Sequence, residues 1–260
     1  MAGGGRRGGP CGPAEPAIIR GVAWYQEWFG QEYLELYSHR DAGEAGAHVT
    51  FVESVLEWPR PTSVLDLACG AGRHTRALRQ RGFRALGVDL SLTLLTESPE
   101  LPRVAGDIRC LPFAGGTFDW VLSFFTSFGY FESERQNFLV LEEVARILRP
   151  GGHFLLDLFN RERVVRNLVA TESRELAGSE AKIERWFDRD TQRVNKRIEI
   201  RPKDGPARTF VESVRAYSEE EVVVGLRWAG LELDASYGNF DGGPYGRDSE
   251  RLILAGRRPR

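Results

Sequence analysis

The sequence predicts an α/β fold whose centre is a doubly wound, mostly parallel β-sheet. Between residues 61 and 160, short apolar segments alternate with amphipathic segments, and glycine or proline often separates the two kinds. Parallel strands require crossover connections, usually helices, so this alternation favours a parallel sheet covered on both faces. After residue 160 the pattern changes to strands joined by short polar turns, which predicts an antiparallel β excursion before a last helix.

The composition is that of a globular protein: 260 residues can bury a full core, and 42% are hydrophobic and 28% charged. A formal net charge of −2 gives no overall basic field, so neither nucleic acid nor a membrane is an expected partner. No apolar run approaches the roughly 20 residues that span a bilayer. Three cysteines and four histidines without ligand spacing predict no metal site and a reducing, cytoplasmic compartment.

The first 60 residues divide into a tail and helices. Residues 1–16 are rich in Gly and Pro and contain no apolar stretch, so we expect a disordered tail and no secretory signal. A single domain is expected over residues 17–260. In its first part, residues 17–60, aromatic side chains recur at three- and four-residue steps, which predicts a helix. A second helix near residues 45–57 is ended by Pro59 and Pro61.

Five strands and two helices are expected in the core region, residues 61–160. The strands lie at residues 63–68, 85–91, 103–108, 118–125 and 153–159. One helix covers residues 73–81 and is closed by Gly82, and the other covers about 132–148 and ends before Gly151.

The rest of the chain comprises the antiparallel excursion, residues 161–217, and a final segment, residues 218–260. Strands of the excursion are expected at residues 182–187, 192–201 and 207–217. Ser218 and Glu221 have the spacing of a capping box, which predicts the start of a helix. Strands at residues 231–237 and 251–257 finish the chain.

The segment VLDLACGAGRHT, residues 64–75, is an apolar strand that runs into a glycine turn and then into a helix. Gly70 and Gly72 allow the backbone to approach a ligand closely and to adopt angles closed to other residues. Dinucleotide, phosphate and S-adenosylmethionine sites all use such a turn, so the glycine pair alone does not separate them.

Acidic residues at the strand ends separate these possibilities. A carboxylate at Asp66 would repel a phosphate at the helix N-terminus, whereas S-adenosylmethionine has no phosphate and carries an ammonium group. Thr75 stands where a dinucleotide fingerprint has Gly or Ala, and no Gly-Lys-Ser/Thr follows. Asp89 can accept both ribose hydroxyls, and Asp107 the adenine amino hydrogen while Ile108 packs on the ring. Each aspartate could instead cap a helix or turn, but three at successive strand ends favour a ligand.

In order and spacing, VLDLACGAGRHT, LGVDLS, GDIRCLPF, FDWVLSFFTSFGYF and LRPGGHFLLDLF resemble the motifs of class I S-adenosylmethionine-dependent methyltransferases of the small-molecule type. The resemblance covers about residues 20–160 and the two final strands. It implies a Rossmann-like, seven-stranded sheet with an antiparallel last strand, and methyl transfer from S-adenosylmethionine to an N or O atom of a small molecule. Ala68 stands where the family often has glycine, and we expect its methyl group to leave the site open.

The resemblance also implies which residues surround the cofactor. Those of the core are Asp66, Ala68, Gly70, Gly72, Asp89, Leu90, Asp107, Ile108 and Phe124. The N-terminal helices resemble those that fold over the cofactor in small-molecule methyltransferases, which makes Tyr25, Tyr33, Tyr37 and Arg40 candidate contacts, although the tyrosines could simply pack. Arg40 would pair with the methionine carboxylate, and Arg73 is the alternative.

Acceptor contacts are expected from two parts of the chain. Tyr130 lies beyond the carboxyl end of the fourth strand and carries a hydroxyl group. Tyr217 and Tyr237 are placed near the acceptor by topology alone, as are Asn239 and Tyr245. By resemblance, the excursion is a lid over the substrate or a contact in a homodimer.

No residue is identified as catalytic. His74 is expected to be a surface or cap histidine, and His153 to lie at the end of the sheet opposite the cofactor. Methylation of RNA or protein is an alternative activity, although residues 123–126, Ser-Phe-Phe-Thr, lack the Asn/Asp-Pro-Pro-Tyr/Phe motif common in base-modifying enzymes. A non-catalytic S-adenosylmethionine-binding regulator is the other alternative.

Overall fold

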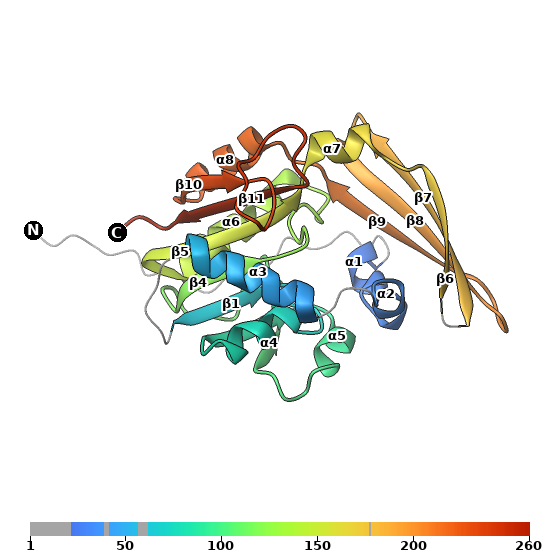
Figure 1. The fold of residues 1–260 in the computed structure, drawn as a ribbon, viewed down its shortest axis with the longest axis horizontal. Coiled ribbons are helices and arrows are strands. Elements are labelled where there is room, and N and C mark those ends of the chain that lie inside the picture. The colour runs from blue at the N-terminus through green and yellow to red at the C-terminus, as the bar shows by residue number, and fades with distance from the viewer. Residues whose placement is uncertain (1–21, 39–41, 57–61, 177) are drawn as a thin grey trace, which may run out of the picture.

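The computed structural model describes residues 22–38, 42–56, 62–176 and 178–260 (Figure 1). In these residues the chain forms a seven-stranded sheet, a four-stranded sheet and eight helices. The expected disordered tail, residues 1–16, and the candidate contact Arg40 lie outside the described residues. The division into one domain with named parts stays a prediction.

The seven-stranded sheet confirms the predicted fold class. Its order is β10-β11-β5-β4-β1-β2-β3. The strands are β1 (Ser63–Leu67), β2 (Arg84–Asp89), β3 (Arg103–Ala105), β4 (Phe118–Ser123), β5 (Leu148–Phe159), β10 (Glu232–Tyr237) and β11 (Arg251–Arg257). Strands β1 to β5 pair in parallel, and β11 is antiparallel to both of its neighbours. Chain order reverses between β1 and β4, and open α/β sheets bind ligands at the strand ends beside such a reversal.

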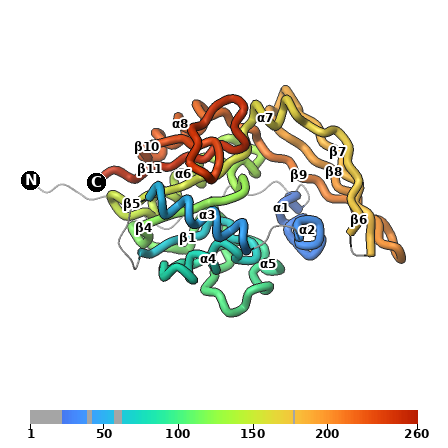
Figure 2. Tube along the Cα trace, in the orientation of Figure 1, coloured from blue at the N-terminus to red at the C-terminus, as the bar shows by residue number. Residues whose placement is uncertain are grey.

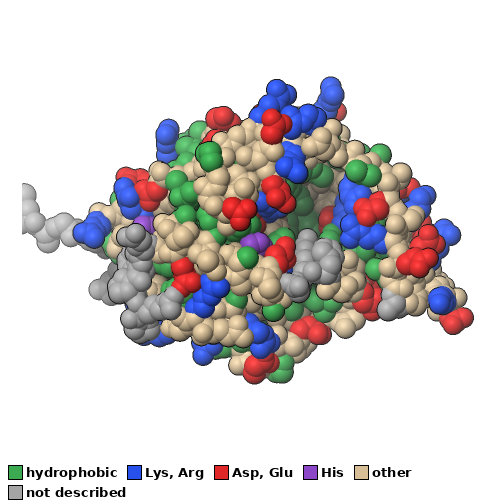
Figure 3. Space-filling view, in the orientation of Figure 1, with side chains coloured by type: hydrophobic (Ala, Val, Ile, Leu, Met, Phe, Trp, Pro, Cys, Tyr) green, Lys and Arg blue, Asp and Glu red, His purple; other side chains and the backbone are tan. Residues whose placement is uncertain are grey.

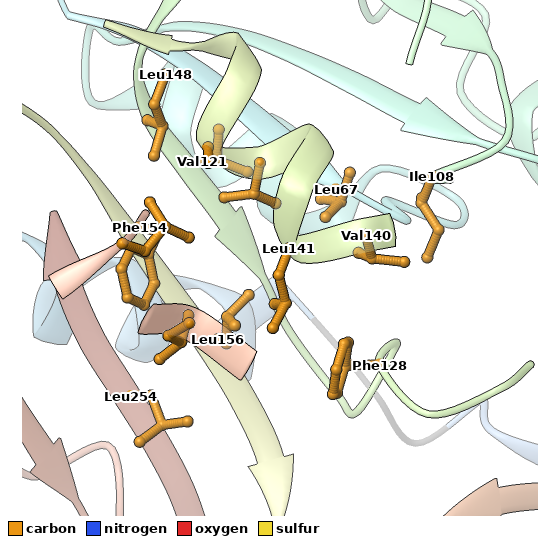
Figure 4. Packing of buried hydrophobic residues seen from close by; sticks show 14 of the residues in the cluster. Leu67, Ile108, Val121, Phe128, Val140, Leu141, Leu148, Phe154, Leu156 and Leu254 are labelled. Carbon is orange, nitrogen blue, oxygen red and sulfur yellow. The ribbon is translucent and has the colours of Figure 1, made fainter. Parts of the chain in front are cut away.

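Helices cover both faces of this sheet because neighbouring strand residues point to opposite sides. The covering helices are α3 (Ala42–Val55), α4 (Arg73–Gln80), α5 (Leu92–Thr96), α6 (Glu134–Ile147) and α8 (Glu219–Trp228), and the short α7 (Arg161–Arg166) follows β5. In β4, Val121 packs into a cluster with α6 and α8, whereas Trp120 and Leu122 pack with α3 and α4. Figure 4 shows the first cluster, in which Val121, Leu141 and Leu156 meet.

The capping box predicted at the start of the last helix is confirmed. The Ser218 side chain accepts the Glu221 backbone N–H, and the Glu221 side chain accepts the Ser218 N–H at 2.8 Å. These bonds satisfy two donors that a helix N-terminus otherwise leaves unpaired.

The excursion is a separate antiparallel sheet of four strands, one more than predicted. The strands are β6 (Thr171–Leu176), β7 (Ser179–Asp188), β8 (Arg193–Pro202) and β9 (Arg208–Arg215). The additional strand is β6. Its sequence, TESREL, has no apolar alternation, because this edge strand buries none of its side chains fully. Helix α7 was missed for the same reason, since none of its residues is buried.

The N-terminal helix is broken where one helix was predicted. Helix α1 (Trp24–Trp28) ends before Phe29, and α2 (Gln31–Leu36) begins after Gly30, whose backbone is extended. Glycine is a weak helix former, so tertiary packing decides the chain direction here. Both helices pack against the four-stranded sheet, and Trp28 and Leu36 share a buried cluster with Ile183, Ile198, Ile200, Ala181 and Phe210.

Helices α1 and α2 and the sheet β6–β9 together are called the cover. Trp28 Nε1 donates to Glu212 Oε1 at 2.6 Å, and Arg208 pairs with Glu32. The views in Figures 1 and 2 place α1 and α2 between the four-stranded sheet and the seven-stranded sheet. The N-terminal helices are therefore held from the outer side by β8 and β9.

Arg193 of β8 joins the cover to the segment that follows β4. Its guanidinium donates to the carbonyl oxygens of Gly129, Tyr130 and Phe131 at 3.2, 3.1 and 3.0 Å. It also donates to the Ser213 carbonyl at 2.6 Å and to Ser213 Oγ at 2.8 Å.

We expect Arg193→Met to lower the free energy of unfolding by about 2–3 kcal/mol, because several carbonyl groups would lose a charged donor. Urea unfolding followed by circular dichroism measures this change. Arg197→Met is the matched control on the same strand, because the 3.7 Å pair of Arg197 with Glu184 is exposed and contributes little. Equal losses of unfolding free energy in the two variants would show that Arg193 does not join the cover to the segment after β4.

Candidate functional site

A cavity of about 230 Å³ lies at the carboxyl ends of β1, β2 and β4. Figure 3 shows the molecule hollowed between its main body and the four-stranded sheet. The inner half of the lining comes from the strand ends and the glycine turn: Asp66, Ala68, Cys69, Gly70, Ala71, Arg73, His74, Asp89, Leu90, Ser91, Leu94, Asp107 and Ile108. The outer half comes from the cover and the segment after β4: Tyr25, Phe29, Tyr33, Leu34, Tyr37, Phe124, Phe125, Ser127, Tyr130 and Phe131.

The glycine turn has the left-handed backbone that its sequence predicts. The φ angles of Gly70 and Gly72 are 55° and 82°, and a Cβ atom on Gly72 would lie 2.7 Å from Leu101 Cδ1. Gly70 lines the cavity, whereas Gly72 lies behind it and shapes the turn. Ala68 also has a φ of 57°, and its methyl group leaves the cavity open as expected. This conformation costs an L-residue about 1–2 kcal/mol.

Asp66 places a buried carboxyl group at the inner end of the cavity. Its residue is 1% exposed, and Thr75 Oγ1 donates to Asp66 Oδ2 at 2.6 Å. Burial raises the pKa of Asp66 to about 6, against a hydrogen bond from Thr75 that lowers it. A carboxylate held in such a place gains from a bound cation, and an ammonium group supplies one.

Asp89 ties the glycine turn to the end of β2. Its Oδ2 accepts the Gly70 N–H and its Oδ1 accepts the Ser91 N–H, both at 2.8 Å. Burial raises the pKa of Asp89. Each carboxylate oxygen has two acceptor sites, so both can also receive a hydroxyl hydrogen from a ligand.

Asp107 is paired with Arg109, a residue that the sequence did not single out. Arg109 Nη2 lies 2.6 Å from Asp107 Oδ2, and Arg109 Nε lies 3.0 Å from Oδ1. Burial alone would raise the pKa of Asp107, but the hydrogen bonds from Arg109 outweigh it and lower the pKa. The guanidinium also lies 4.3 Å from the centre of the Phe131 ring. A ligand amino group at Asp107 would therefore share the carboxylate with Arg109.

The outer half of the cavity is aromatic. Phe29 stacks on Tyr130 with ring centres 5.7 Å apart, and Tyr33 meets Phe29 edge-on at 5.0 Å. The Tyr37 hydroxyl is bonded to Lys196 Nζ and to Glu212 Oε1. The rings of Phe29, Tyr33 and Tyr37 therefore bring α1 and α2 into the cavity lining.

Several predicted acceptor residues do not reach this cavity. Tyr217 is buried against Phe128 and donates to Glu134 Oε2 at 2.6 Å, and burial raises its pKa. Tyr237 meets Phe51 edge-on at 5.1 Å. Topology alone placed both residues near the acceptor, but in the structure Tyr217 packs against Phe128 and Tyr237 against Phe51.

The two remaining candidate acceptor contacts, Asn239 and Tyr245, make hydrogen bonds away from the cavity. Asn239 Oδ1 accepts the backbone N–H groups of Asp241 and Gly243. The Tyr245 hydroxyl lies 3.4 Å from Asn160 Oδ1. Neither residue is part of the cavity lining in the described ranges.

The expectation that His74 is a surface or cap histidine is wrong. The residue is 4% exposed and lines the cavity, and its ring stacks on Phe124 at 4.0 Å. His48 Nδ1 of α3 lies 3.1 Å from His74 Nε2. The close packing of α3 on α4 buries this first helical turn, and no local pattern signals that contact.

Within the described ranges, no three His, Cys, Asp or Glu residues gather in a way that could hold a metal ion. In the same residues, no helix has the length and apolarity needed to cross a membrane.

Known proteins share the region around this cavity. A family described as "Methyltransferase domain" matches residues 64–152. Demethylmenaquinone methyltransferase of Mycobacterium tuberculosis (strain H37Ra) is 30% identical over 179 residues, which cover 65% of this chain and 69% of the relative. The chain belongs to the class I S-adenosylmethionine-dependent methyltransferases.

Solved structures support this assignment of the methyltransferase fold. An S-adenosylmethionine-dependent methyltransferase from Clostridium acetobutylicum has a TM-score of 0.74 at 21% identity, over 88% of this chain and 97% of its own. The CcbJ methyltransferase from Streptomyces caelestis has a TM-score of 0.76 at 18% identity, over 90% and 98% of the two chains. These structures confirm the methyltransferase fold. The family match and the 30% identical relative confirm the enzyme class and, with the family, S-adenosylmethionine as its cofactor.

Proposed function

We propose that this methyltransferase transfers a methyl group to an N or O atom of a small molecule bound in the aromatic half of the cavity. The observation that carries the proposal is that α1, α2 and the segment after β4 wall this half with aromatic rings. Pockets of this kind suit small ligands. The name of the 30% identical relative, a demethylmenaquinone methyltransferase, agrees with an acceptor of low molecular weight.

The inner half suits the cofactor residue by residue. Asp66 would face the ammonium group, Asp89 would accept the ribose hydroxyls, and Asp107 with Ile108 would hold the adenine. Gly70 and Ala68 would let the backbone approach the cofactor closely. Arg73 is paired with Glu44 in this structure, and its guanidinium would also pair with the methionine carboxylate. The remaining cofactor contacts of this proposal are Leu90 of the inner half and three residues of the outer half that would lie where cofactor and acceptor meet: Phe124, Tyr25 and Tyr33.

The chain's own residues act here mainly by alignment. S-adenosylmethionine supplies a methyl group on a sulfonium centre, and displacement at that group requires an acceptor held in line with it. Positioning can contribute about 7–11 kcal/mol to such a reaction. Tyr130 has its ring against Phe29 and Trp24, and we propose that it contacts the acceptor.

The test is transfer of tritiated methyl from S-adenosylmethionine by the full-length protein to three fractions of a cell extract: small molecules, RNA and protein. We expect label in the small-molecule fraction. Label confined to RNA or protein would overturn the proposed acceptor class, and cofactor binding without turnover would indicate a regulator. A cytoplasmic location and a homodimer stay predictions, the latter checked by light scattering.

A further inference from the structure

The turn after β4 contains two consecutive residues with a left-handed backbone. Phe125 and Thr126 both have a φ of 59°, and neither is glycine. This conformation is rare for a β-branched or bulky side chain and costs about 1–2 kcal/mol for each residue. Phe125 lines the cavity, and Thr126 lies between the lining residues Phe125 and Ser127, so the strained turn is at the edge of the candidate site. Such strain persists only where the surroundings hold it.

Asp157, on β5, accepts hydrogen bonds from the backbone of this turn. Its Oδ2 accepts the Phe125 N–H at 2.7 Å, and its backbone oxygen accepts the Thr126 N–H at 2.9 Å. The Asp157 side chain is fully buried, so these bonds are shielded from water. One residue therefore fixes both strained backbone groups.

Arg251, at the start of β11, completes the arrangement. Its Nε donates to Asp157 Oδ1 at 2.6 Å, and its Nη2 donates to Thr126 Oγ1 at 3.1 Å. The Thr126 hydroxyl oxygen also accepts the Phe159 N–H at 2.8 Å. The ion pair thus reaches the turn through the side chain of Thr126 as well as through the backbone of Phe125.

Stability alone is a weak reason for this ion pair. Removing charges from water is costly, and apolar side chains of similar volume often stabilise a core equally well. The pair instead fixes the place of the Phe125 ring, which lies 4.3 Å from the Arg73 guanidinium and 5.7 Å from that of Arg251. The rings of His48 and His74 also pack against the Phe125 ring, tilted, with ring centres 5.5 and 5.9 Å away.

We propose that Asp157 and Arg251 are positioning residues for methyl transfer. They hold the Phe125–Thr126 turn in its strained shape, so that residues 124–127 align the acceptor with the methyl group. The inference rests on the proposed function, because it assigns the acceptor to this part of the cavity. Neither residue lines the cavity in the part of the chain that the structure describes, and the pair reaches the cofactor side only through the Phe125 ring beside Arg73. We therefore expect its loss to lower the rate of methyl transfer more than the affinity for the cofactor.

The test compares Arg251→Gln with Arg257→Gln in the full-length protein. Arg257 is on the same strand and pairs with Asp234 at 2.6 Å, away from the cavity. With the small-molecule extract and saturating tritiated S-adenosylmethionine, we expect Arg251→Gln to lower the rate of methyl transfer by about tenfold to a hundredfold. Its Kd for S-adenosylhomocysteine, measured by calorimetry, should stay within about threefold of the wild-type value. The reason is that Asp66, Asp89 and Asp107 form no hydrogen bond or ion pair with the pair in the described ranges, and of the charged residues proposed to hold the cofactor only Arg73 touches the Phe125 ring. Arg257→Gln should leave both quantities unchanged.

Amide hydrogen exchange followed by mass spectrometry gives a readout that needs no acceptor. Peptides covering residues 124–127 should lose protection in Arg251→Gln and in Asp157→Asn, but not in Arg257→Gln. Unchanged protection, or an unchanged rate of methyl transfer in a folded Arg251→Gln, would overturn the positioning role. If the wild-type protein labels no small molecule, the proposed function fails, and the exchange result still decides whether the pair holds the turn.

Discussion

Asp66→Asn is expected to make the protein more stable at neutral pH and to bind its cofactor less tightly. The folded state raises the pKa of Asp66 from 3.8 to about 6 through burial. At pH 7 the wild-type carboxylate is charged in a place that disfavours charge, at a cost of up to about 3 kcal/mol. Asparagine removes that charge and can still accept the hydrogen bond from Thr75.

The sign of the pH dependence follows from the direction of this shift. Between pH 3.8 and about 6, the folded state holds the Asp66 proton more tightly than the unfolded state. The contribution of Asp66 to stability therefore falls as the pH rises through this window, and it is constant above it. Urea unfolding at several pH values should show this fall in the wild type and its loss in Asp66→Asn.

Ligand binding separates a charge effect at Asp66 from a general disturbance of the cavity. Affinity for S-adenosylhomocysteine should fall about tenfold to a hundredfold in Asp66→Asn, because a charged partner of the ammonium group is lost. 5′-Methylthioadenosine has the same nucleoside but no amino-acid group, so its affinity should not change. Equal losses for both ligands would show that Asp66 does not face the ammonium group.

Elements with strong local signals were predictable from the sequence. The strand at residues 251–257 was predicted with its observed bounds, and the capping box at Ser218 placed the start of α8 correctly. The glycine turn and Asp89 were predicted because a strand, two glycines and a strand-end carboxylate lie close together along the chain. Local patterns determine such features, and the residues that they single out do line or shape the cavity.

Features that depend on distant contacts could not be predicted in this way. Asp157 and Arg251 are 94 positions apart, and nothing near either residue indicates the other. The break at Gly30 depends on packing against β8 and β9, which lie more than 150 residues further along the chain. Burial of His74 likewise depends on α3, so its position in the helix alone suggested an exposed side chain.

Asp89→Ala should weaken cofactor binding by about a hundredfold or more, the largest effect that we expect from a single change at the site. The variant removes the acceptor of the Gly70 and Ser91 N–H groups, so the glycine turn loses a support and the ribose loses its proposed partner. Calorimetry with S-adenosylhomocysteine measures the loss, and urea unfolding checks that the variant is folded. Asp89→Asn keeps one acceptor oxygen, so its affinity for S-adenosylhomocysteine should lie between those of the wild type and Asp89→Ala.

The role of Asp89 toward the ribose can be isolated by changing the ligand together with the protein. Removing the 2′ and 3′ hydroxyls of 5′-methylthioadenosine should weaken its binding to the wild type, because Asp89 would lose both hydroxyl donors. The same change should have little effect on Asp89→Ala, since the partner is already absent. If the two proteins discriminate equally between these ligands, Asp89 supports the glycine turn only, and another group must bind the ribose.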